Sequence, residues 1–201
     1  TDVKVQISGV GRDLPQFREL AAAPPYQVGD ILLHQKYEDF KTSLNRTANS
    51  LGFFDAEYVT RTIEVNPDTR QAQVRIHFDT GKRYRVGKVA VQQDVLDGKH
   101  LQRFMRVRQG DTYDVEAIRK QQQLLEGGNY YSEVLVSSDY EKAVNGEVPI
   151  KIEAKRRKRY SYTGKVGYAT DSGAHTEAGM DIHWVNAKGH KLNTRGSIGQ
   201  T

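Results

Sequence analysis

The chain contains one sequence pattern twice, and this repeat constrains the fold more than any other feature. Residues 74–89 read VRIHFDTGKRYRVGKV, and residues 148–166 read VPIKIEAKRRKRYSYTGKV. Each stretch has apolar residues at alternate positions, then a basic cluster with an Arg-Tyr pair, then Gly-Lys-Val. A pattern that recurs in this way indicates a chain built from one supersecondary unit used more than once.

The first copy of the unit is predicted to run strand–helix–helix–strand–strand. Alternating apolar residues indicate a strand at 3–7, and a short helix is expected after it. Residues 37–51 carry apolar side chains at steps of three and four, as an amphipathic helix does, and Gly52 is the expected left-handed stop. Strands rich in β-branched residues at 56–65 and 74–78 complete the unit.

The second copy has the same order of elements and the same anchors. The Gly-Asp pair at 29–30 recurs at 110–111, and the aromatic pair at 53–54 recurs at 130–131. Asn129 stands at the helix stop, where Asn tolerates the left-handed conformation. The predicted apolar stripe of the helix before it is Val115, Ile118, Leu124 and Leu125.

The closing hairpin of the second copy has a clear turn signal and one uncomfortable residue. Asn145-Gly146 between two alternating segments strongly favours a two-residue hairpin turn. Pro149 falls in a strand that should be central, and proline has no amide N–H to donate. We therefore expect residue 149 to lie where no partner strand needs a hydrogen bond from it.

From Tyr160 onward, helical spacing gives way to alternation. One side of the predicted strands collects apolar side chains, namely Tyr160, Tyr162, Val166, Tyr168, Ala178, Met180, Ile182, Trp184, Leu192 and Ile198. Turns are expected at 171–173 and 186–189. Such strands suit a transmembrane barrel, but a soluble β-meander gives much the same pattern. Three strands cannot close a barrel, so most of a barrel would lie outside this sequence.

Composition excludes several classes of protein. The chain has 201 residues, of which 37% are hydrophobic and 27% charged, so disorder is not expected. No apolar run approaches the roughly 18–20 residues of a transmembrane helix. The absence of cysteine removes disulfides and thiolate sites, and the net charge of +5 suits nucleic acid, anionic lipid or simple solubility. The chain starts at Thr1 without Met, so we expect a piece of a longer protein.

These features together resemble the POTRA (polypeptide-transport-associated) repeats and first barrel strands of the outer-membrane assembly family. The resemblance rests on YEDFKTSLNRTANSLGFFDAEY (37–58), GKRYRVGKV (81–89), QGDTYDVE (109–116) and VGYATDSG (166–173). It implies an α+β fold of tandem POTRA repeats followed by the first antiparallel strands of a truncated transmembrane β-barrel. The implied domains are a second POTRA repeat at 1–83, a third at 84–156 and the barrel start at 157–201.

The resemblance also implies a function in outer-membrane protein assembly or translocation. The implied location is the Gram-negative outer membrane, with the repeats in the periplasm. Implied partners are unfolded outer-membrane protein clients of the autotransporter type, an inner-membrane-anchored partner protein and outer-membrane lipid. Two alternatives stay open: a general barrel-assembly or two-partner-secretion homologue, and a nucleic-acid-binding repeat protein, although no nucleic acid is expected.

The resemblance places three groups of candidate site residues. In POTRA-like folds the strand after the second helix is an exposed edge, to which an extended client could add by main-chain hydrogen bonds. Protected edges with ordinary packing are the alternative. The edge positions here are Glu57, Val59, Arg61, Ile63, Val134 and Val136. The seam strand of the barrel is Tyr160 to Thr170, with Tyr160, Tyr162, Val166 and Tyr168 as its candidate residues. The third group is a basic rim of Lys155, Arg156, Arg157, Lys158 and Arg159.

The basic rim is open to three interpretations. It could be a solvated linker, a periplasm-facing rim that contacts acidic lipid head groups or barrel turns, or a nucleic-acid site with stacking aromatics. We expect no catalytic residues, no metal site and no cofactor. His175 and His183 could share a strand face with Asp181, but their spacing favours surface or lumen histidines over metal ligands.

Overall fold

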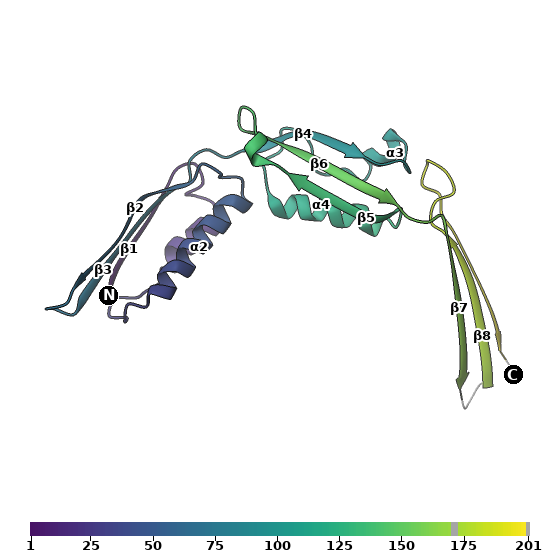
Figure 1. The fold of residues 1–201 in the computed structure, drawn as a ribbon, viewed down its shortest axis with the longest axis horizontal. Coiled ribbons are helices and arrows are strands. Elements are labelled where there is room, and N and C mark those ends of the chain that lie inside the picture. The colour runs from purple at the N-terminus through teal and green to yellow at the C-terminus, as the bar shows by residue number, and fades with distance from the viewer. Residues whose placement is uncertain (170–172, 200–201) are drawn as a thin grey trace. The chain divides into compact units, whose positions relative to one another are not determined.

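The computed structural model describes residues 1–169 and 173–199 (Figure 1). The chain forms two compact units. The first unit comprises residues 1–88, 109–117 and 139–149, and the second comprises 89–108, 118–138 and 150–201. Within the described residues, no helix is long and apolar enough to cross a membrane.

The first copy of the repeated unit has the predicted order of elements. It consists of β1 (Asp2–Ser8), α1 (Pro15–Ala22), α2 (His34–Ser50), β2 (Glu57–Asn66) and β3 (Gln71–Asp79). The strand order in the sheet is β1-β3-β2, with β3 parallel to β1 and antiparallel to β2. The last strand of the copy is therefore central, and the strand after the second helix is outermost.

The core of this copy lies between the sheet and the two helices. Ala72, Val74, Ile76 and Phe78 alternate along β3 and are buried, whereas the residues between them are more exposed. The predicted stripe of α2 is confirmed, because Tyr37, Phe40, Leu44 and Ala48 are all buried. Figure 1 shows α2 running along one face of the sheet. The opposite face remains open and polar.

The second copy repeats the arrangement. Its elements are β4 (Arg85–Gln92), α3 (Gly98–Gln102), α4 (Val115–Gly127), β5 (Tyr131–Ser138), a short 3₁₀ turn (Tyr140–Lys142) and β6 (Glu147–Arg156). The strand order β4-β6-β5 again places the last strand in the centre and the strand after the long helix at the edge. The mixed α+β fold of two strand–helix–helix–strand–strand units is thus confirmed.

The anchors shared by the two copies also share backbone conformation. Gly29 and Gly110 have φ of +98° and +88°, and Gly52 has φ of +83°. Asn129 adopts φ of +56° at the equivalent helix stop, as expected for an Asn that replaces Gly. The recurrence of the sequence therefore reflects recurrence of local geometry.

The hairpin before β6 has the predicted turn. Asn145 and Gly146 have φ of +54° and +77°, and Val144 and Glu147 exchange both backbone hydrogen bonds. Pro149 is accommodated because its carbonyl accepts from the Asp139 amide, just beyond the last pair of β5 and β6. The N–H and C=O of one strand residue point to the same side. An amide N–H at position 149 would therefore point past the end of β5, so no residue of β5 loses a hydrogen bond because Pro149 has none.

One helix stripe was predicted wrongly in part. Ile118 and Leu125 of α4 are buried, but Leu124 is 37% and Val115 is 43% exposed. Gln121, with 1% exposure, takes the central buried position. A polar residue therefore occupies a core position of α4, and the pattern of apolar residues did not predict it.

The third sheet contains β7 (Tyr160–Ala169), β8 (Gly173–Ile182) and β9 (Leu192–Gly199) in the order β7-β8-β9. All neighbours are antiparallel, and Tyr162 pairs with Met180, which pairs with Thr194. Residue 170 of the predicted seam strand and residues 171–172 of the predicted turn lie outside the described residues. The register confirms the predicted alternation, because apolar residues of the strands lie opposite apolar residues, glycine, alanine or threonine, and charged residues lie opposite one another, polar residues or glycine on the other face.

Candidate functional site

The two edge strands predicted from the repeat, β2 and β5, are the outer strands of their sheets. Each pairs on one side only, β2 with β3 and β5 with β6, within the described chain. The other side of each strand presents backbone N–H and C=O groups in the described residues. An unpaired edge of this kind can accept another extended strand.

Side chains on the predicted edge positions differ in exposure. Val59 is 56% exposed, Glu57 and Arg61 are exposed, and Ile63 is half-buried. In β5, Val136 is half-buried.

Val134 has 3% exposure, so its side chain belongs to the core and only its backbone is at the edge. Leu135, 54% exposed, is the apolar side chain that β5 presents on its open face. Leu135 is not among the predicted edge positions, because Val134 and Val136 alternate with it along the strand.

Both edge strands carry an irregularity near their start. The register of β2 shifts between Tyr58 and Thr60, and that of β5 shifts between Tyr131 and Glu133. Such a bulge inserts an extra residue, increases the local twist and interrupts the ladder. The regular part of each edge therefore begins after the bulge. In β2, Val59 is itself the bulge residue, between Tyr58 and Thr60.

The five residues of the basic rim have different surroundings. Lys155 Nζ lies 2.7 Å from Glu133 Oε2, and this hydrogen bond raises the pKa of Lys155. Arg156 Nη1 lies 3.5 Å from Asp94 Oδ2. These two cations at the end of β6 thus have carboxylate partners.

Arg159 is held between two aromatic rings where the chain enters β7. Its guanidinium carbon lies 5.5 Å from the Tyr160 ring centroid and 5.1 Å from that of Trp184. Its Nη2 donates to the Val185 carbonyl at 3.1 Å, and Trp184 Nε1 donates to the Arg157 carbonyl at 3.3 Å. These contacts tie residues 157–160 to the segment after β8.

The loop between β8 and β9 packs against the second copy of the repeat, within the second unit. The Asp97 amide donates to the Ala187 carbonyl at 3.1 Å, and the Tyr130 hydroxyl donates to the Gly189 carbonyl at 2.8 Å. Lys191 Nζ lies 4.3 Å from the Tyr130 ring centroid. Burial lowers the pKa of Lys191.

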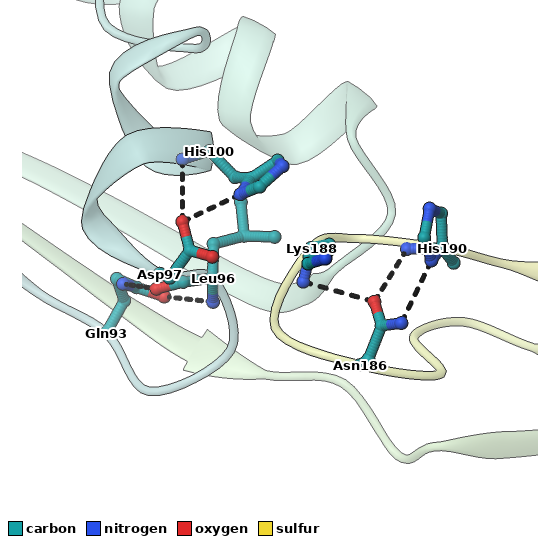
Figure 2. A network of polar contacts seen from close by, with 7 residues as sticks. All are labelled: Gln93, Leu96, Asp97, His100, Asn186, Lys188 and His190. Atoms are coloured by element: carbon teal, nitrogen blue, oxygen red, sulfur yellow. Dashed lines mark hydrogen bonds and ion pairs between the residues drawn. The ribbon is translucent and has the colours of Figure 1, made fainter.

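Polar side chains stiffen both sides of this contact (Figure 2). The Asn186 carboxamide oxygen accepts from the Lys188 and His190 amides at 3.1 and 3.4 Å. On the other side, the Asp97 carboxylate accepts from the His100 amide at 2.9 Å and caps α3. Figure 2 shows the 186–190 loop beside residues 93–100. The loop is therefore a structured contact, a property that its sequence NAKG did not reveal.

The predicted seam residues line one exposed face of the third sheet. Tyr162, Val166 and Tyr168 are 75%, 86% and 77% exposed, and Tyr160 is 46% exposed. The opposite face is polar and includes an ion pair between Lys165 and Glu177 at 3.6 Å. The third sheet thus has one apolar and one polar face, and both are open in the described chain.

One cluster has the residue types of a hydrolytic triad but a different geometry. Ser8 Oγ donates to Asp79 Oδ2 at 2.8 Å, and His77 Nε2 lies 3.0 Å from Ser8 Oγ. Since the hydroxyl proton already points to the carboxylate, His77 serves as donor to Ser8 rather than as its base. The cluster holds β1 to β3.

The histidines of the third sheet do not converge. His175 and His183 lie on one face, eight positions apart along the chain, which corresponds to about 26 Å in an extended strand. His183 Nε2 lies 3.0 Å from Ser161 Oγ instead. Among residues 1–169 and 173–199, no three His, Cys, Asp or Glu side chains gather as a metal site would require.

Comparisons with known proteins agree with this architecture. Residues 84–157 match the POTRA family model, described as surface antigen variable number repeat. The whole chain is similar to the structure of BamA from Haemophilus ducreyi lacking POTRA domains 1–3, with a TM-score of 0.72 and 21% identity. That alignment covers 99% of this chain and 37% of the other.

Two further solved structures are similar over nearly the whole chain. CdiB from Acinetobacter baumannii has a TM-score of 0.54 and 16% identity, with 98% of this chain and 38% of that chain covered. CdiB from Escherichia coli has a TM-score of 0.52 and 11% identity, with 98% and 35% covered. At these identities the likeness concerns the fold, in which POTRA-like units precede antiparallel strands that match the barrel region of BamA. The chain spans well under half the length of these three structures.

Proposed function

We propose that this chain is part of an Omp85/TpsB superfamily protein that assembles or translocates proteins at the Gram-negative outer membrane. In this proposal, residues 1–83 and 84–156 are periplasmic POTRA repeats, and residues 157–201 begin the transmembrane barrel. Three observations support it: the POTRA match of the second copy, the same fold in the first copy, and the likeness of the complete chain to BamA.

The observation that carries the proposed role is the recurrence of an open edge at the same place in both copies. β2 and β5 are each the strand after the long helix and each lie outermost in their sheet. Main-chain pairing at such an edge requires an extended segment but no fixed sequence. Edge pairing would therefore suit unfolded β-rich clients of varied sequence. The edge residues Glu57, Val59, Arg61, Ile63, Val134 and Val136 are the proposed contact positions.

A narrower proposal follows from the sequence motifs quoted above, which resemble those of TamA, the outer-membrane subunit of the translocation and assembly module. On this proposal the repeats are the second and third POTRA domains of that protein. The partner is a TamB-like protein anchored in the inner membrane, and the clients are autotransporter-like barrel proteins. The first barrel strand, with Tyr160, Tyr162, Val166 and Tyr168, would form the seam at which clients insert.

The likeness to BamA and CdiB favours a second candidate, a general barrel-assembly or two-partner-secretion protein. These possibilities differ in the number of POTRA repeats before the barrel, so the sequence of the full-length gene distinguishes them.

A nucleic-acid role has less support. Lys155 and Arg156 already have carboxylate partners, and the ring of Tyr160 is next to Arg159. Charge neutralisation and stacking within the chain reduce what the basic rim offers to phosphates and bases.

Site-specific photocrosslinking in intact cells tests the proposed function. Probes are placed at Val59, Val136 and Tyr162, and an autotransporter is induced as client. Matched control probes go to Arg75 and Lys151, which are exposed residues of the central strands β3 and β6. Because both sides of a central strand are already paired, we expect client adducts at the edge and seam positions and few at the controls.

The pattern of adducts separates the parts of the proposal. Adducts at Tyr162 alone would mean that the seam handles clients and that the repeats position the barrel or dock a partner. Equal adducts at edge and control positions would contradict edge pairing. Absence of client adducts at all three test positions, with probe incorporation verified, would reject client contact.

A further inference from the structure

A second surface lies where the third sheet meets the repeat. Five cations gather there, from the β6–β7 link and from the β8–β9 loop. They are Arg157, Lys158, Arg159, Lys188 and Lys191, and we call them the basic collar. Two hydrogen bonds hold these segments to Tyr130: the Arg157 amide donates to the Tyr130 carbonyl at 2.9 Å, and the Tyr130 hydroxyl donates to the Gly189 carbonyl at 2.8 Å.

Most of the collar charge is available to an external partner. Lys158 and Lys188 are exposed, and neither they nor Arg157 has an ion-pair partner within residues 1–169 and 173–199. The two collar segments carry no carboxylate of their own, and in the segment before α3, which contacts the β8–β9 loop, Asp97 pairs with His100 and Asp94 with Arg156. The collar therefore presents net positive charge that the fold does not use.

Amphipathic aromatic side chains lie at the same level as the collar. Tyr160 begins β7 with 46% exposure, and half-buried Trp184 follows the end of β8. The exposed apolar face of the sheet starts here and continues along Tyr162 and Val166. Tyr and Trp rings prefer the boundary between hydrocarbon and water, with the polar tip in the head-group layer. Cations directly beyond such rings lie where phosphate groups lie.

We propose that the basic collar binds the head groups of anionic phospholipids in the membrane leaflet nearest the repeats. The inference rests on the proposed function, because it requires β7–β9 to lie in a membrane. The aromatic residues among the cations favour lipid over an acidic protein, which would need no apolar boundary at the same level. Lipid contact at this level would fix the depth of the sheet and orient the repeat that the β8–β9 loop holds.

The only Trp of the sequence lies within the collar and supplies the probe. The full-length protein, with any Trp outside these 201 residues replaced by Phe, is reconstituted into phosphatidylcholine vesicles. A minor fraction of the lipid is bromine-labelled phosphatidylglycerol or, in parallel, bromine-labelled phosphatidylcholine. Since bromine quenches Trp184 only at close range, the difference in quenching measures which lipid is enriched at the collar.

We expect several-fold enrichment of phosphatidylglycerol over phosphatidylcholine around Trp184, falling as salt is raised because salt screens exposed charges. Each cation near an anionic surface strengthens binding by about fivefold. The double variant Lys158→Gln/Lys188→Gln should therefore lose most of the enrichment. The matched variant Lys36→Gln/Arg46→Gln removes two exposed charges from α2 and should retain it.

Other outcomes separate this inference from the proposed function. Equal quenching by the two lipids, with the protein inserted, would overturn the lipid preference and leave the assembly function standing. Enrichment that survives in Lys158→Gln/Lys188→Gln would overturn the assignment to the collar. Absence of quenching by either lipid would show that the strands do not insert, and would count against the proposed function as well.

Discussion

At the scale of single residues, two glycines with the same backbone conformation have different surroundings. Gly52 has φ of +83°, and a Cβ there would lie 2.8 Å from Tyr113 Cβ. Gly110 has φ of +88°, and a Cβ there would meet nothing within 4 Å. Both need a residue that tolerates the left-handed region, but only Gly52 is also needed for close packing.

Alanine at these two positions should therefore have unequal effects. Gly110→Ala should lower the free energy of unfolding by about 1 kcal/mol, the cost of a left-handed alanine. Gly52→Ala should lower it by about 2–4 kcal/mol, because Tyr113 must also move and the core is close-packed. Urea unfolding followed by circular dichroism measures both values. Equal losses would show that Tyr113 moves away at little cost.

Asp79 links the end of β3 to the segment before β4 and should make stability depend on pH. Its carboxylate accepts from the Gly81 amide at 2.7 Å and from Ser8 Oγ at 2.8 Å. These bonds lower the pKa of Asp79, the Gly81 bond most. Because the folded state favours the charged carboxylate, its stabilisation is complete above the unfolded pKa of about 3.9 and is lost as pH falls below that value.

We expect Asp79→Asn to reduce the free energy of unfolding at neutral pH by about 1–2 kcal/mol, through loss of charge-assisted hydrogen bonds. The free energy of unfolding of the variant should also fall less steeply below about pH 4 than that of the unmodified chain. Asp68→Asn, in the exposed β2–β3 turn, is the control. An acid decline as steep in Asp79→Asn as in the unmodified chain would contradict this role.

At the scale of elements, Gln121 holds the segment between α3 and α4. Its side-chain oxygen accepts from the Arg106 and Val107 amides at 2.6 and 3.2 Å, and its nitrogen donates to the Phe104 carbonyl at 2.9 Å. The side chain is almost fully buried, so water cannot replace these bonds. One residue of the helix thus stabilises a segment that has no regular structure.

Gln121→Leu should lower the free energy of unfolding, although it places an apolar side chain at a buried position. It removes the partner of the buried Val107 amide and of the part-buried Arg106 amide and Phe104 carbonyl, and a buried group left unsatisfied costs about 1–3 kcal/mol. We expect the free energy of unfolding to fall by at least about 2 kcal/mol and the amides of residues 106 and 107 to exchange hydrogen faster. Gln123→Leu, at an exposed position two residues further along the helix, is the control. Unchanged exchange at 106 and 107 would show that the segment is held by other contacts.

The sequence predicted elements well where one period dominates and poorly where a contact joins distant segments. Alternation and helical spacing located β3 and α2 because each buries one face, and alternation located the strands of the third sheet because their apolar side chains share one face. Gln121 was missed because its partners are backbone groups in a loop. The carboxylates opposite Lys155 and Arg156 come from other elements, so nearly half of the basic rim is neutralised by residues that the run KRRKR does not contain.

At the scale of the whole molecule, the third sheet is the part whose own fold does not bury its apolar side chains. Val166 is 86% and Ile198 is 83% exposed, and both lie opposite Thr176 of β8. Exposed apolar side chains on a water-facing sheet would promote aggregation, whereas a hydrocarbon environment would accept them. The polar face, which carries the ion pair of Lys165 and Glu177, instead requires contact with water or polar groups.

Adjacent residues of β9 allow this difference to be tested with the same substitution. Ile198 lies on the apolar face and Ser197 on the polar face, opposite Glu177. Arginine facing lipid near the membrane midplane costs about 2–4 kcal/mol, whereas charges on the inner face are tolerated. Ile198→Arg should therefore reduce assembly of the full-length protein into lipid vesicles, measured by protease protection, and Ser197→Arg should assemble nearly as the unmodified protein does. Equal assembly of the two variants would mean that neither face contacts hydrocarbon, and the barrel assignment of residues 157–201 would fail with it.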